Sequence, residues 1–329
     1  MRFLLALPTA YCLLPSYCLV LACAIPTLGQ QAAPLHVHVN LVNVAFSVRS
    51  ADGVLVTNLT RDDVEVFEDG LPQKIEFFAR SADLPLSLGL VADFSGSQEH
   101  FLKPHHHDLQ TFLDTVLGPR DQAFLLGFGN HLRLLSDFSP SSSQLMQALA
   151  EYERGHGHYP ELGPDDEDRE AGTAFYDAIY YSVVEKLAGA SDARKALIVF
   201  SDGEDNSSAH HMLDAIEAAQ SENVRVFGIR YTEREHGHLT ARNKYGTSVM
   251  HRIAEETGAA DFDAREGDIQ TWFEQIAEEL RSSYELAYYP AAAASPDGSF
   301  HKITIRPKRA GLTVRCKTGY FVRTAGSQQ

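Results

Sequence analysis

The chain has 329 residues, of which 44% are hydrophobic and 22% charged, and these are ordinary values for a folded globular protein. Its formal net charge of -16 argues against nucleic acid or an anionic membrane as a partner, because binding phosphates needs clustered Lys and Arg. The length favours one domain of ordinary size with a smaller companion.

Residues 1–31 have the pattern of a secretory signal peptide followed by a short leader. Arg2 precedes a long apolar run that closes on the small residues Ala22-Cys23-Ala24. We expect cleavage after Ala24, and the alternative is a weak lipobox at Val20-Leu21-Ala22-Cys23 that would leave Cys23 lipidated. The protein is therefore predicted to be exported and then periplasmic, associated with the cell envelope or secreted, with no transmembrane span after the signal is removed.

Cysteine usage agrees with this interpretation. Three of the four cysteines lie inside the predicted signal, so cleavage after Ala24 leaves Cys316 as the remaining cysteine. A single cysteine cannot form an internal disulfide.

Residues 32–83 are predicted to form short antiparallel strands. Apolar and polar residues alternate from Leu35 to Phe78, and the pattern is interrupted by turn signals at Asp52-Gly53 and Asp69-Gly70. This segment has too few residues for a core of its own.

In residues 84–284 the pattern is different, because apolar runs of strand length alternate with amphipathic stretches of helix length. This alternation is typical of a parallel sheet covered by helices on both faces. The expected strands are 86–92, 122–128, an edge strand at 131–137, 196–200, 224–231 and a weaker one at 260–263. The expected helices are 101–116, 143–152, 174–187, 209–221, 248–257 and 269–284. The fold class is therefore α/β, with a doubly wound, Rossmann-like and mainly parallel sheet of six strands.

Residues 285–329 return to alternation, with strands expected at 285–289, 301–305 and 312–320. Since both flanks are rich in strands and neither is long enough alone, we expect them to pair into one small β-sandwich from which the α/β domain emerges.

Polar residues follow two of the buried strands where they end. The first strand runs into Asp93-Phe94-Ser95-Gly96-Ser97, and the strand at 196–200 runs into Ser201-Asp202-Gly203. In doubly wound sheets ligands bind outside the carboxyl ends of the strands, so Asp93 and Asp202 are expected to face one crevice. Carboxylates and hydroxyls offer only oxygen ligands, which suit Mg²⁺ first and Mn²⁺ or Ca²⁺ as alternatives.

These residues, with Gly172-Thr173-Ala174-Phe175-Tyr176-Asp177-Ala178, resemble the metal-ion-dependent adhesion site of von Willebrand factor A domains in order and spacing. The resemblance implies that Ser95 and Ser97 contact the metal directly, Thr173 directly or through water, and Asp93 and Asp202 mainly through water. It also implies a protein partner whose Asp or Glu completes the coordination. The oligomeric state does not follow from it.

The flanks extend this resemblance to bacterial von Willebrand factor A-related envelope proteins of the acidobacterial kind. The segments that carry it are 59–70, Leu-Thr-Arg-Asp-Asp-Val-Glu-Val-Phe-Glu-Asp-Gly, and Thr318-Gly319-Tyr320-Phe321. The chain departs from the pattern at Ala171, where a second glycine often precedes the threonine, and in the long loop at 154–170.

Three other interpretations compete with a metal-dependent binding protein. Asp93, Ser95 and Thr173 are also residue types that cap helices. The histidine runs at 105–107, 210–211, 156–158 and 236–238 raise the alternative of a zinc hydrolase. A passive envelope scaffold with a vestigial metal site is the third. Because the chain has no Gly-x-Ser-x-Gly, no P-loop and no His-Glu-x-x-His motif, we expect a binding protein rather than an enzyme.

Overall fold

A computed structural model describes residues 41–96, 103, 106–164, 172–190, 193–232, 238–291, 296 and 298–322. The predicted signal peptide at 1–31 lies outside this part of the chain. Within the described residues, no helix is long and apolar enough to cross a membrane.

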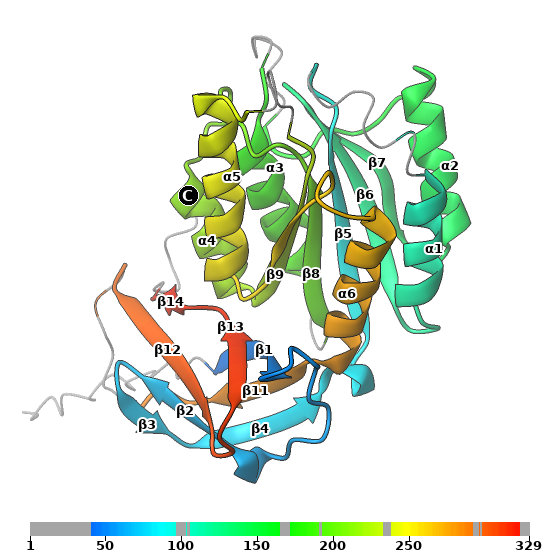
Figure 1. Cartoon of the computed structure of the whole chain (residues 1–329). Coiled ribbons are helices and arrows are strands. Elements are labelled where there is room, and N and C mark those ends of the chain that lie inside the picture. Colours follow the sequence, from blue (N-terminus) through cyan, green and yellow to red (C-terminus); the bar gives the residue numbers. More distant parts are fainter. Residues whose placement is uncertain are drawn as a thin grey trace, which may run out of the picture. The chain divides into compact units, whose positions relative to one another are not determined.

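A six-stranded sheet forms the centre of the larger region (Figure 1). Its strands are β5 (Leu86–Asp93), β6 (Gln122–Phe128), β7 (Leu132–Ser139), β8 (Arg194–Phe200), β9 (Val224–Arg230) and β10 (Asp261–Asp263). Their order is β10-β9-β8-β5-β6-β7, and β7 alone among them runs antiparallel to its neighbour. The predicted doubly wound, mainly parallel α/β fold is confirmed.

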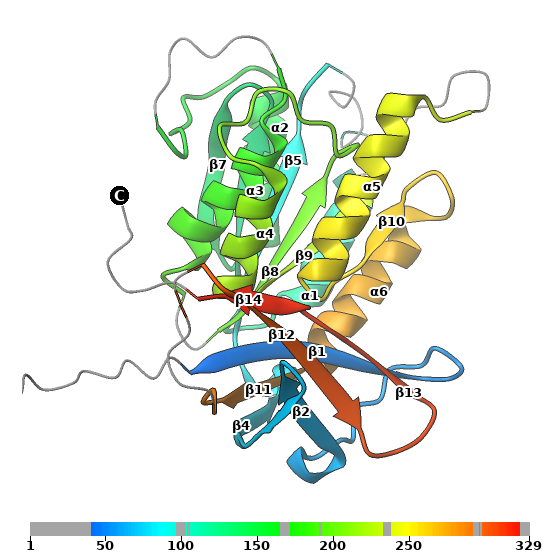
Figure 2. The same ribbon diagram turned by 90° about the vertical axis from the view of Figure 1, so that its left-hand side faces the viewer.

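Helices cover both faces of this sheet, as predicted. α1 (His106–Val116), α2 (Ser142–Glu153) and α6 (Ile269–Ser282) pack on one face, whereas α3 (Phe175–Tyr181), α4 (Met212–Ser221) and α5 (Ala241–Glu256) pack on the other (Figure 2). β5 is buried along its whole length, with Leu88 and Leu90 in one core and Val91 in the other. Burial on both faces explains why its sequence is a nearly continuous apolar run.

Several predicted helix boundaries are wrong for local reasons. α5 begins at Ala241 rather than at residue 248, because the Thr240 side chain caps it by accepting a 3.1 Å hydrogen bond from the Asn243 N–H. α4 begins at Met212 rather than at residue 209, after the capping residue His211. The helix predicted at 174–187 is confirmed, because α3 continues as a π-helical segment, Ser182–Leu187. The helix predicted from 269 to 284 ends at Ser282, because the backbone is already extended at Ser283.

The flanks form two antiparallel four-stranded sheets with a shared core. The strands are β1 (Val42–Ser50), β2 (Val64–Glu68), β3 (Leu71–Gln73), β4 (Ile75–Arg80), β11 (Tyr284–Tyr288), β12 (Phe300–Pro307), β13 (Leu312–Cys316) and β14 (Gly319–Phe321). One sheet has the order β13-β1-β11-β4 and the other β14-β12-β2-β3. Each sheet therefore pairs strands from before the α/β region with strands from after it.

The strand predicted at 312–320 is in fact two strands that belong to different sheets. β13 pairs with β1, and β14 pairs with β12. The segment between them turns away because Lys317 is buried and donates a 2.8 Å hydrogen bond to the carbonyl of Gln220 in α4, while the Thr318 N–H donates to the Glu256 carbonyl at the end of α5.

Glu279, a buried residue of α6, binds arginines from three strands. Arg225 of β9 forms an ion pair with it, as do Arg49 of β1 at 3.0 Å and Arg315 of β13 at 3.1 Å. Burial opposes ionisation of Glu279, but these arginines hold its pKa below the ordinary value. The carboxylate therefore links the α/β region to two strands of the flanking sheets.

We expect Glu279→Gln to lower the free energy of unfolding by about 3–5 kcal/mol, because it leaves buried arginine charge without its partner. Urea unfolding followed by circular dichroism measures this. Glu278→Gln is the matched control, since Glu278 is the exposed neighbour on the same helix and should change stability by less than about 0.5 kcal/mol. If both substitutions lowered the free energy of unfolding equally, the ion pairs of Glu279 would contribute nothing to stability.

Candidate metal centre

Asp93 is the last residue of β5, and its side chain is 2% exposed. One carboxylate oxygen accepts a 2.9 Å hydrogen bond from the Ser95 N–H, and the other accepts a 2.7 Å bond from the Ser201 hydroxyl. The Ser95 side chain also bonds to this carboxylate. The ends of β5 and β8 are thus joined through Asp93 and Ser201, as expected of neighbouring parallel strands.

Asp202 follows β8 and is 3% exposed. Its carboxylate accepts a 3.1 Å bond from the Glu204 N–H, which closes a tight turn over Gly203. Gly203 has φ +78°, and a Cβ there would lie 2.4 Å from the Gly246 carbonyl oxygen of α5. Two glycines therefore let the Asp202 turn lie directly against a helix.

Thr173, also buried, belongs to the loop before α3. Its N–H donates a 2.7 Å bond to the Asn206 side chain, and its carbonyl accepts from the N–H groups of Asn206 and Ser207. The loop before α3 is therefore tied to the loop after β8. The residue that caps α3 is Ala174, which makes no side-chain cap, so capping of this helix is not the role of Thr173.

The loop after β8 is held by carboxylates beyond the five predicted metal-site residues. Asp177 of α3 accepts bonds from the N–H groups of Ala209 and His210, and Asp205 accepts from the Tyr176 N–H. The run from 201 to 206 contains three acidic residues, but the sequence does not show which of them could bind a cation and which hold the loop.

The electrostatics of this edge favour a bound cation. Burial, and to a smaller extent the charge of Asp202, raises the pKa of Asp93 to about 6 against the opposing effect of hydrogen bonds from Ser95 and Ser201. Burial and then Asp202 also raise the pKa of Glu204. Two buried carboxylates that repel each other, among hydroxyl groups, form an oxygen-donor set that fits a hard divalent ion.

The remaining predicted site residues differ in what can be said of them. Ser97 lies outside the described residues, as do residues 165–170 of the long loop, Ala171, His105 and His236. Among the histidines of the predicted runs, His106 binds Glu153 at 3.1 Å and His210 binds Asp177 at 2.8 Å. Within the described chain, the group of three His, Cys, Asp or Glu side chains with close ligand atoms lies elsewhere, in the flanking sheets.

Comparison with known proteins finds chains that are similar to this one among the solved structures. No protein-family model matches the chain, and no curated protein matches it. The conserved hypothetical protein BatB from Bacteroides thetaiotaomicron shares 14% identity over 59% of this chain and 97% of its own, with a TM-score of 0.43. The von Willebrand factor domain of the type V pili tip protein Mfa5 from Porphyromonas gingivalis shares 13% over 60% and 95%, with a TM-score of 0.43.

A third similar structure is proximal thread matrix protein 1 from the mussel byssus, described with a zinc-occupied metal-ion-dependent adhesion site. It shares 15% identity over 65% of this chain and 49% of its own, with a TM-score of 0.46. In this chain, the strand order of the sheet and the helices on both of its faces define a doubly wound, mainly parallel α/β domain.

The close approach of Gly203 and Gly246 gives a test of how this edge is built. In Gly246→Ala the added Cβ would lie 2.4 Å from the Asp202 carbonyl oxygen, so the turn or α5 must shift. We expect a loss of about 1–3 kcal/mol in the free energy of unfolding, measured with urea. Gly189→Ala is the control because its Cβ meets no atom within 4 Å, and it should be neutral or slightly stabilising.

Proposed function

We propose that this protein is an exported binding protein that holds a divalent cation at the carboxyl edge of its central sheet and binds an acidic group of a protein partner through it. The residues proposed to hold the cation are Asp93, Ser95, Ser97, Thr173 and Asp202. Mg²⁺ is the proposed ion, with Mn²⁺ or Ca²⁺ as alternatives.

The observation that carries this proposal is the burial of Asp93 beside Asp202. Each side chain is almost inaccessible, and the electrostatic effect of Asp202 on Asp93 is repulsive. Burying two carboxylates together is costly unless a cation offsets their charge. A divalent ion would do so, and an ion bound partly through neutral hydroxyls keeps positions that a carboxylate from outside can occupy.

The proposal includes a role in binding without catalysis. Of the histidines in the predicted runs, His106 and His210 each contact one carboxylate, at 3.1 and 2.8 Å respectively, which favours structural contacts over a hydrolytic zinc centre built from these runs. Export rests on the signal-like pattern of residues 1–31. The passive scaffold differs from the proposed function by one measurable property, which is that it binds no cation at this edge.

Isothermal titration of Mg²⁺, Mn²⁺ and Ca²⁺ into the mature protein tests the cation. We expect one equivalent to bind, and Ser95→Ala and Asp202→Asn to weaken binding about tenfold or more, because each removes an oxygen donor or a charge. Asp52→Asn, in an exposed turn of the flanking sheets, is the control for lost negative charge and should leave the affinity unchanged. No heat with any of the three ions, or equal affinity in all variants, would support the passive scaffold.

The acidic partner group is tested with a peptide array in which every Glu or Asp peptide has a Gln or Asn twin. We expect the wild-type protein to retain acidic peptides over their amide twins only when the divalent ion is present, since the neutral amide is a weaker ligand for the ion. Chelation should abolish the difference, and Asp202→Asn should not show it. Retention that is the same for acidic and amide peptides would contradict metal-mediated binding.

A further inference from the structure

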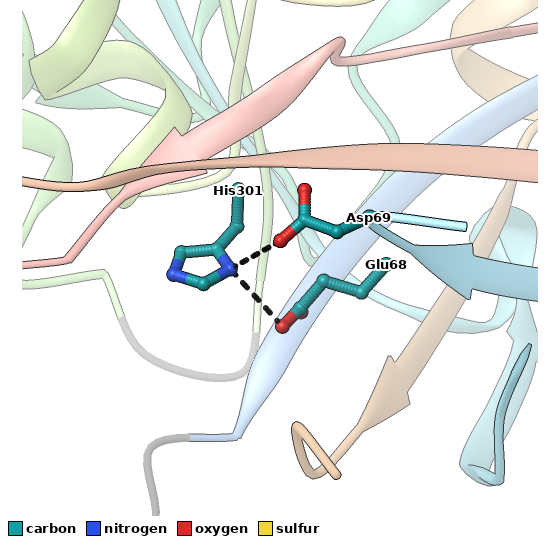
Figure 3. Close-up of side chains that lie close together, drawn as sticks. All are labelled: Glu68, Asp69 and His301. Atoms are coloured by element: carbon teal, nitrogen blue, oxygen red, sulfur yellow. Dashed lines mark hydrogen bonds and ion pairs between the residues drawn. The ribbon is translucent and has the colours of Figure 1, made fainter. Parts of the chain in front are cut away.

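Glu68, Asp69 and His301 converge in the flanking sheets (Figure 3). Glu68 ends β2, Asp69 opens the turn to β3, and His301 lies near the start of β12. β2 and β12 pair antiparallel with Glu68 opposite Ile303, and the Asp69 N–H donates a 2.9 Å bond to the Lys302 carbonyl. This pairing brings His301 beside the turn although 232 positions separate it from Asp69.

The three side chains point their ligand atoms at one another. His301 Nδ1 lies 2.8 Å from an Asp69 oxygen and 3.5 Å from a Glu68 oxygen, and one ligand atom of each residue lies within 4.8 Å of the other two. Two ligands of a tetrahedral zinc ion at about 2.0 Å are about 3.3 Å apart, a value that lies between the two observed distances. To hold an ion, the His301–Asp69 separation would lengthen and the His301–Glu68 separation would shorten toward this value.

Each carboxylate is held by its other oxygen. The second Glu68 oxygen accepts hydrogen bonds from the hydroxyls of Tyr288 at 2.7 Å and Tyr320 at 3.1 Å. The second Asp69 oxygen accepts a 2.8 Å bond from the Lys302 N–H. Hydrogen bonds of this kind orient metal-binding carboxylates in proteins, because they fix one oxygen and leave the other directed into the site.

The imidazole is fixed in the same way. The His301 ring stacks on Tyr320, with centroids 5.5 Å apart, and its Nε2 lies 3.3 Å from the Ser299 hydroxyl, so Nδ1 faces the carboxylates. Glu68 is 3% exposed and His301 8%, whereas the Asp69 side chain is 47% exposed. The group is buried on one side and open to solvent at Asp69, which gives an ion a path of entry.

We propose that Glu68, Asp69 and His301 form a binding site for a transition-metal dication of the Zn²⁺ class. One imidazole nitrogen with two carboxylate oxygens suits zinc and its neighbours, whereas Mg²⁺ and Ca²⁺ prefer oxygen alone. Three protein ligands leave a fourth coordination position on the solvent side, at Asp69. The site is independent of the cation proposed at Asp93 and differs from it in donor chemistry.

A bound ion would link the two flanks of the chain. It joins the β2–β3 turn, which precedes the α/β region, to β12, which follows it. Because the ligands meet only in the folded state, binding stabilises the fold by mass action.

The test is titration of the full mature protein with Zn²⁺, followed by calorimetry, and with Co²⁺, followed by its visible absorption, in the presence of excess Mg²⁺. We expect one equivalent of each at this site, and His301→Gln and Asp69→Asn to lower its affinity at least tenfold. Asn suits position 69, where φ is +50°, so Asp69→Asn should keep the turn even if His301→Gln disturbs the sheet. Zn²⁺ should also raise the melting temperature of the wild type and not that of Asp69→Asn.

Two controls separate this site from others. His107→Gln removes an exposed histidine of α1 and should leave the affinity unchanged, which accounts for adventitious zinc on surface histidines. Asp202→Asn disables the other proposed site and should also leave zinc binding intact, so the two proposals fail independently. Zinc affinity in Asp69→Asn and His301→Gln equal to that of the wild type would overturn the proposal and identify the cluster as an ion pair only.

Discussion

The parallel pairing of β5 with β8 is the constraint on which the candidate metal centre depends. The register that sets Ala92 opposite Phe200 brings the next residues of both strands, Asp93 and Ser201, to the same edge, where they are hydrogen-bonded. Because both strands are buried on two faces, polar side chains are accommodated only where the strands end. The carboxylates are therefore concentrated at the edge where doubly wound folds bind ligands.

The contacts with α6, and through Glu279 with the flanks, lie toward the amino ends of strands of the same sheet. Arg225, which contacts Glu279, is the second residue of β9, and Arg194, the first residue of β8, donates a 2.7 Å bond to the Leu280 carbonyl of α6. The amino ends of β8 and β9 therefore make structural contacts, whereas the candidate metal centre lies at the carboxyl edge of the sheet. Substitutions in one set should change stability with little effect on cation affinity, since distant sites are usually additive.

The two candidate metal sites are selective for different reasons. The edge at Asp93 and Asp202 offers only oxygen donors, which favour hard ions. The Asp202 turn at this edge is held against α5 by the close contact of two glycines. The cluster at His301 adds an imidazole nitrogen, which shifts preference toward zinc. As proposed, the two sites would bind ions of different class, because their donor atoms differ.

The sequence alone predicted the six strands of the central sheet, the helices between them and the residues at the ends of β5 and β8. It could do so because the spacing of apolar residues and the polar residues that follow a strand are local patterns. It did not predict the start of α5, which a single threonine cap sets, or the division of residues 312–320 between two sheets. Nor did it connect Glu279 with three arginines or Asp69 with His301. Those contacts join positions far apart in the chain, and only strand pairing and packing in the tertiary structure decide which distant residues meet.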